Sequence, residues 1–185
     1  MRYGGIVKAV EQVKSRYNED DPVRLCKAMG IVLIYQSFGT AADAIKGFMI
    51  RIKRIDAIIV NSDMSPILQR IIIAHELGHA VLHKDSSLFP FRETALFDES
   101  SRYEKEANLF AAEYILDDNS VMEALNTDNT FFSAAAGFNV PMEFLDFKFR
   151  IMKWKGYKVV KSPITSKSNF LRDLEVPDNK DDYCG

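Results

Sequence analysis

The three histidines of this 185-residue chain are spaced four residues apart, at His75, His79 and His83. The first two frame the sequence HELGH, which follows directly after the apolar run 71–74. Residues four apart share one face of a helix, with their Cβ atoms about 5–6 Å apart. A helix that is apolar all round is buried, and burying two imidazoles together with Glu76 is costly unless they have partners. We therefore expect a buried helix in which a bound metal ion removes that cost.

The spacing of the first two histidines is typical of a zinc site. Two imidazoles one helical turn apart can bind the same ion, each at about 2.0–2.1 Å. Glu76 follows His75 directly, so its carboxylate projects beside the metal and can take a proton from an activated water. We predict zinc bound by His75 and His79, with Glu76 as the general base. Because a motif with three fixed positions also arises by chance, its place in a buried helix after a hairpin is what favours the metal.

A catalytic zinc usually has three protein ligands, so a further one is needed. His83 lies about 12 Å from the first histidine along a straight helix, and we interpret it as a histidine at the helix end. The helix predicted over 100–116 offers several acids. We predict Glu106, which flanks the apolar stripe of that helix, as the third ligand, with Glu113 as the alternative. Glu104 is rotated about half a turn away and is expected on a solvated face.

A helix with the HExxH motif is typical of metalloproteases, and attack on a peptide carbonyl also needs a group that stabilises the oxyanion. Three side chains of the same helix are candidates, Tyr103, Asn108 and Tyr114, each with a structural role as the alternative. A substrate segment can add as a strand beside the predicted hairpin, whose edge offers backbone hydrogen-bonding groups.

The rest of the chain alternates between helical and strand-like patterns. Strand-like runs at 31–35, 47–52 and 56–61 precede the histidine helix, and the last two are typical of a hairpin. Helices are expected over 5–18, 23–29, 66–82, 100–116, 120–125, 130–136 and 141–155, with a final strand-like run at 157–160. This order of elements favours an α+β fold, and a chain of this length usually forms one compact unit.

The zinc motif together with the sequence EANLFAAE, from Glu106 to Glu113, resembles the ImmA/IrrE family of metallopeptidases. The similarity extends from about Asp21 to about Tyr157. One difference is that the family often has an apolar residue and a proline after the glutamate helix, where this chain has two aspartates from Asp117. The resemblance implies a gluzincin-like site, in which two histidines and one glutamate bind zinc.

The resemblance also implies a fold and a biological role. It implies a small zincin-like domain over 1–128, in which a short three-stranded, mainly antiparallel sheet packs on the HExxH helix. A helical C-terminal subdomain over 129–160 and a polar tail over 161–185 would follow. Family members, found on prophages and mobile elements or in stress responses, cleave or otherwise inactivate a helix-turn-helix repressor. We therefore expect a zinc-dependent metallo-endopeptidase that derepresses such genes. The alternative is a non-catalytic zinc-containing regulatory or DNA-binding protein that inactivates its partner by binding alone.

Charge and composition restrict the partners. The net charge of −2 gives no overall attraction to nucleic acid or anionic membranes. The segment from Lys148 to Lys167 is basic and lacks acids; we interpret it as the face of a packed helical lid, with nucleic-acid binding as the alternative. No apolar run approaches the roughly 20 residues that span a bilayer. The two cysteines, Cys26 and Cys184, are not expected to pair, and a cytoplasmic location is expected.

Overall fold

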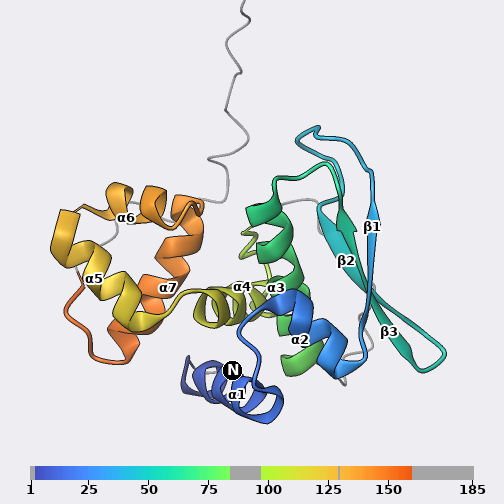
Figure 1. Ribbon diagram of the computed structural model, residues 1–185, viewed down its shortest axis with the longest axis horizontal. Helices are drawn as coiled ribbons and strands as arrows, with labels where there is room; N and C mark the ends of the chain where they lie inside the picture. Colours follow the sequence, from blue (N-terminus) through green and yellow to red (C-terminus); the bar gives the residue numbers. More distant parts are fainter. Residues whose placement is uncertain (1–2, 84–96, 129, 160–185) are drawn as a thin grey trace, which may run out of the picture.

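The computed structural model describes residues 3–83, 97–128 and 130–159, and the α+β class is confirmed in them. Figure 1 shows α3 and α4 at the centre, with the sheet on one side and α5 to α7 on the other. The elements are α1 (Tyr3–Tyr17), α2 (Pro22–Met29), β1 (Val32–Gln36), β2 (Gly47–Ile52), β3 (Ile55–Asn61), α3 (Pro66–Leu82), α4 (Arg102–Ile115), α5 (Asp118–Asp128), α6 (Phe131–Gly137) and α7 (Met142–Trp154).

The sheet has the strand order β1-β3-β2 and is mixed. The predicted hairpin is confirmed, because β2 pairs antiparallel with β3. Strand β1 runs parallel to β3, so only one of the two pairings is antiparallel. The connection between β1 and β2 crosses over β3 and is held by Asn61, whose amide donates to the carbonyl oxygens of Gly39 and Ile45. This crossover leaves room for β3 to insert between the two earlier strands.

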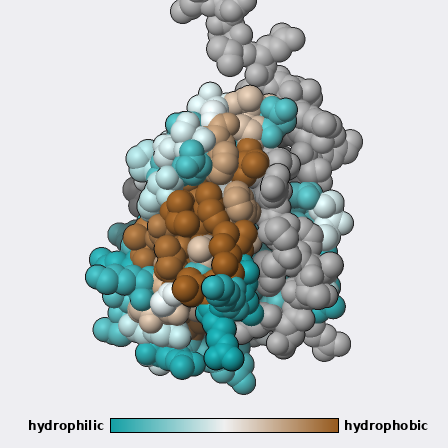
Figure 2. Space-filling model, turned by 90° about the vertical axis from the view of Figure 1, so that its right-hand side faces the viewer, coloured by the Kyte–Doolittle hydropathy of each residue, from teal (hydrophilic) through white to brown (hydrophobic). Residues whose placement is uncertain are grey.

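The two faces of the sheet differ in their surroundings. One face packs against α3, and its side chains Met49, Ile58 and Val60 are buried. The opposite face, on the side shown in Figure 2, carries apolar side chains that stay partly exposed over the strands. The most exposed of these are Val32, Ile34, Ile52 and Ile55. The sheet therefore supports the histidine helix with one face only.

Helix α3 is buried from Ile71 to Ala80, as its apolar sequence predicts. It packs closely against α4 at Gly78. A Cβ atom at Gly78 would lie 3.0 Å from the Cα atom and 3.2 Å from the carbonyl oxygen of Ala107. The missing side chain therefore lets the two helix backbones approach closely, which brings side chains of α4 within reach of the histidines.

Several predictions concern parts of the chain that form no regular structure or are not described. Residues 157–159 form no strand, and Val160 and the predicted tail over 161–185 lie outside the described residues. The division into a domain over 1–128 and a subdomain over 129–160 stays a prediction. None of the helices described combines the length and the apolar character that a membrane crossing requires.

The close approach at Gly78 can be tested by Gly78→Ala. Overpacking costs about 1–3 kcal/mol, and the better helix propensity of alanine, worth about 1 kcal/mol, offsets only part of it. We expect the free energy of unfolding to fall by about 1–2 kcal/mol, measured by urea denaturation. The control is Gly137→Ala at the end of α6, where an added Cβ has no neighbour within 4 Å. An unchanged Gly78→Ala protein would show that the helices can separate without cost.

Candidate metal centre

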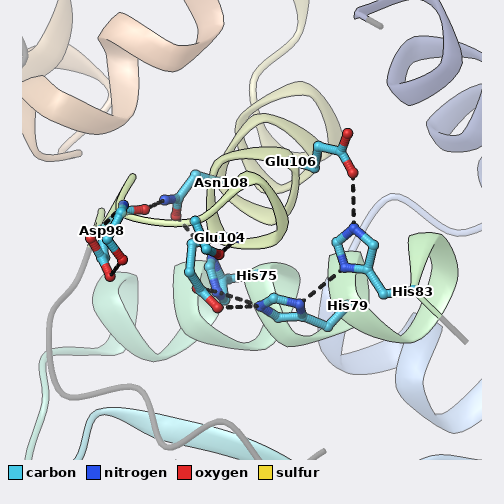
Figure 3. A network of polar contacts seen from close by, with 9 residues as sticks. His75, His79, His83, Asp98, Glu104, Glu106 and Asn108 are labelled. Atoms are coloured by element: carbon cyan, nitrogen blue, oxygen red, sulfur yellow. Dashed lines mark hydrogen bonds and ion pairs between the residues drawn. The ribbon is translucent and has the colours of Figure 1, made fainter. Parts of the chain in front are cut away.

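Two histidines of α3 and one glutamate of α4 converge in a buried cluster (Figure 3). The Nε2 atoms of His75 and His79 are 3.0 Å apart. The carboxylate of Glu104 lies 3.1 Å from Nε2 of His75 and 3.5 Å from Nε2 of His79. Among the residues that the structure describes, this is the one group of three potential ligands whose atoms converge, all within 4.8 Å of one another. The cluster can therefore hold a metal ion.

Glu104 reaches the histidines because of its position on α4. Residues three and four apart share a helix face, so Glu104, Ala107 and Asn108 all face α3. Ala107 marks the contact with Gly78, and Asn108 contacts His75. The hydroxyl of Ser101 accepts a hydrogen bond from the backbone N–H of Glu104 and caps the helix, which fixes the first turn of α4 beside the site.

The expectation that Glu104 lies on a solvated face is wrong, because the residue is only 6% exposed. The apolar stripe assumed from the sequence comprised Tyr103, Ala107, Phe110, Ala111 and Tyr114, of which all but Tyr103 are buried. Burial extends beyond this stripe to Glu104. The small residue Ala107 marks the face that approaches α3, and Glu104 precedes it by three positions on that same face. This spacing is the signal that identifies it.

The other two acids considered from the sequence are buried but engaged elsewhere. Glu106 accepts hydrogen bonds from Nε2 of His83 at 3.0 Å and from Nε of Arg102 at 2.8 Å. It is not part of the converging group found among the described residues. Glu113 lies near the other end of α4, 2.7 Å from Nζ of Lys148. The structure therefore brings Glu104, rather than Glu106 or Glu113, to the two imidazoles.

The ionisation of the cluster suits a metal. Burial by itself would raise the pKa of Glu104, but hydrogen bonds and charge interactions with His75 and His79 hold that pKa well below its usual range. Burial lowers the pKa of His79, and this outweighs the hydrogen bond to the Glu104 carboxylate that would raise it. The carboxylate is therefore ionised and the imidazole neutral, which are the forms in which these groups bind metal ions.

The sequence suggested Asn108 only as a group that could stabilise the oxyanion. In the structure it orients the ring of His75. Its Nδ2 donates to the carbonyl oxygen of Asp98 at 2.8 Å, so its Oδ1 faces Nδ1 of His75 at 2.9 Å. An amide oxygen only accepts, so Nδ1 carries a proton, and Nε2 is the nitrogen left to bind a metal ion. Nε2 faces the Glu104 carboxylate at 3.1 Å. A metal ion bound there would be held by imidazole nitrogens and a carboxylate oxygen, a donor set that fits zinc.

Comparison with known proteins agrees with this geometry. Residues 26–150 match the family described as IrrE N-terminal-like domain. The chain belongs to the ImmA/IrrE family of metallopeptidases. It is 32% identical over 146 residues to immunity region protein 2 of Bacillus phage phi105, covering 79% of this chain and 90% of that protein. It is 30% identical over 146 residues to metallopeptidase ImmA of Bacillus subtilis strain 168, covering 78% and 83%. The resemblance inferred from the motifs is thus confirmed.

In this ImmA/IrrE member, part of the basic segment that starts at Lys148 faces inward. Lys148 is 1% exposed, and its Nζ lies 2.7 Å from Glu113 and 2.5 Å from Asp118. Lys155 pairs with the same two acids. Arg150 pairs with Glu99 and Asp146. These contacts agree with a packed helical lid, while Lys161 and Lys167 lie outside the described residues.

The buried ion pairs predict a stability effect at Lys148. Removing one partner of a buried pair leaves uncompensated charge and costs about 3–5 kcal/mol. Because Lys155 still pairs with both acids, we expect Lys148→Met to lower the free energy of unfolding by about 3 kcal/mol in chemical denaturation. Lys153→Met, at an exposed position of the same helix, is the control and should change it by less than about 0.5 kcal/mol. Equal stability of the two variants would contradict the prediction.

The different positions of Glu104 and Glu106 predict different effects of the same substitution. Glu104→Gln removes a charged ligand candidate, so we expect zinc affinity to fall by more than about 100-fold. This exceeds the loss of about 10–100-fold that is usual when a residue hydrogen-bonded to a metal ligand is changed. Glu106→Gln keeps an oxygen that accepts from His83, and we expect a loss below about 10-fold. Zinc binding by the metal-free proteins is measured in competition with a coloured chelator. The reverse order of affinities would show that Glu106 is the ligand.

Proposed function

We propose that this protein is a zinc-dependent metallo-endopeptidase with His75, His79 and Glu104 as its metal ligands. The observation that supports it is that two Nε2 atoms and one carboxylate converge in a buried cluster, and that the helix carrying both histidines also carries Glu76. In this proposal Glu104 replaces Glu106, which the sequence alone favoured. Membership in a metallopeptidase family supports the peptidase activity, and the imidazole and carboxylate donors support zinc as the metal.

The reaction assigns separate tasks to the side chains. When bound, zinc would supply the Lewis acidity that activates water and polarises the peptide carbonyl. Glu76 follows His75 on α3 and is 3% exposed. Its carboxylate takes a proton from the attacking water and delivers it to the leaving amide nitrogen. Asn108 holds the ring of His75 so that its Nε2 keeps facing the site.

The contacts of Tyr103, Asn108 and Tyr114 show which of these three side chains is available to stabilise the oxyanion. The hydroxyl of Tyr114 donates to the carbonyl oxygen of Glu19 at 2.8 Å, and the side chain is buried. Asn108 already uses its amide oxygen and nitrogen to orient His75. Tyr103 remains partly exposed, next to the ring of His83. Of the three candidates, Tyr103 therefore suits a contact with substrate best.

For the substrate, we propose a helix-turn-helix repressor, cleaved in the cytoplasm. The names of the two relatives, an immunity region protein and metallopeptidase ImmA, support a role in the control of a phage or mobile element. The strand order leaves β2 at an edge of the sheet, and α3 packs against β2. An extended segment of the repressor can add to that edge as a further strand and so be held near the histidine helix.

The proposal is tested with Glu76→Gln. This variant keeps all three ligands, so we expect unchanged zinc content, measured by atomic absorption. Without a general base, cleavage should slow by about 10²–10⁴-fold, measured as repressor fragments on a gel. Glu11→Gln, at an exposed glutamate of α1, is the matched control and should cleave normally.

The same experiment separates catalysis from inactivation by binding alone. If Glu76→Gln releases the repressor from its operator as fast as the unchanged protein, without fragments in either case, the non-catalytic alternative is correct. If Glu76→Gln still produces fragments at the normal rate, the assignment of the general base is wrong.

A further inference from the structure

We propose that His83 and Glu106 act as a positioning pair that fixes the ring of His79 for metal binding. This inference rests on the proposed function, because it assigns a role toward the same metal site. Neither residue belongs to the converging group of ligands among the described residues. Both are buried, at 7% and 4% exposure, and they link α4 to the end of α3.

The first step concerns the carboxylate of Glu106. One of its oxygens lies 2.8 Å from Nε of Arg102, which donates to it, and the other lies 3.0 Å from Nε2 of His83. An ionised carboxylate only accepts hydrogen bonds. Nε2 of His83 is therefore the protonated nitrogen of that ring and donates to Glu106.

The second step passes from His83 to His79. Their Nδ1 atoms are 3.2 Å apart. In a neutral ring whose Nε2 carries the proton, Nδ1 has the lone pair and can only accept. With His83 in this tautomer, Nδ1 of His79 is the donor of the bond between the two rings. That leaves Nε2 of His79, the nitrogen that faces His75 and Glu104, to the metal ion proposed to bind there.

The two chains of hydrogen bonds complement each other, one on each side of the cluster in Figure 3. Asn108 orients His75, and the His83–Glu106 pair orients His79. Both chains include a side chain of α4, the helix that also provides Glu104. A second partner that fixes the ring nitrogen is common for metal-binding histidines and raises metal affinity. His83, which is not one of the proposed ligands, thus has a role in the metal site through its contact with His79.

The test uses leucine and glutamine variants at both positions, with zinc binding measured on the metal-free proteins by chelator competition. Leucine removes the polar groups, so we expect His83→Leu and Glu106→Leu to weaken zinc binding by about 10–100-fold. His83→Gln offers an amide oxygen to His79 and an amide N–H to Glu106, and Glu106→Gln keeps an oxygen for His83. Both should recover most of the affinity. Leucine variants that bind zinc normally, or glutamine variants no better than leucine, would overturn the proposal.

Controls separate this inference from the proposed function. Lys105→Leu, at an exposed position of α4, should bind zinc normally, and circular dichroism checks that every variant folds. If Glu104→Gln binds zinc as well as the unchanged protein, the metal site itself is wrong. If Glu104→Gln loses zinc while His83→Leu and Glu106→Leu do not, only the role of the pair is wrong.

A direct measurement needs no variant. Nitrogen NMR of the zinc-loaded protein at pH 8 distinguishes protonated from bare or metal-bound ring nitrogens. We expect the proton on Nδ1 in both His75 and His79, and on Nε2 in His83. A proton on Nε2 of His79 would overturn the proposal even if a leucine variant fails to fold.

Discussion

The contact between α3 and α4 at Gly78 is the constraint on which the site depends. With no side chain at Gly78, the backbone of Ala107 approaches α3 more closely than any larger residue would allow. Residues of α4 within one turn of this contact then lie beside the histidines. Glu104, Asn108 and Glu106 reach His75, His79 or His83 directly. A wider separation of the helices would leave these buried polar groups without partners, at a cost of several kcal/mol.

Helix α4 is also held at its other end, which makes it a rigid support. Glu113 pairs with Lys148 and Lys155 of the C-terminal part, and Asp118 at the start of α5 shares both cations. Buried ion pairs add little net stability, but their geometry is demanding, so they restrict how α7 can sit on α4. The residues that resembled a nucleic-acid-binding segment thus help to fix the helix that carries the third ligand candidate.

The sequence was sufficient for the motif and for most elements, because their signals are local. His75, Glu76 and His79 follow from spacing alone, and the hairpin from alternation. The parallel pairing of β1 was not predictable, since no local pattern specifies which strand inserts between two others. Glu106 was predicted as the third ligand, but the structure brings Glu104 to the two histidines, and the reason for this difference is another one. Helix α4 is buried almost all round, from Glu104 to Tyr114, so hydrophobic periodicity does not show which face meets α3.

Helix electrostatics give an independent reason for Glu104. It lies in the first turn of α4, where the free backbone N–H groups carry partial positive charge, while His79 lies in the last turn of α3. Negative groups are stabilised at helix N-termini and cations at C-termini, within about one turn of the end. A metal ion held between these turns would lie close to the negative end of α3, and Glu104 lies close to the positive end of α4. Glu113 lies near the far end of α4, where the dipole disfavours a carboxylate, and there Lys148 and Lys155 provide the opposite charge. The first turn of α4 therefore holds a carboxylate where the helix dipole favours it, beside the proposed metal site, whereas at the far end two lysines offset the dipole that disfavours one.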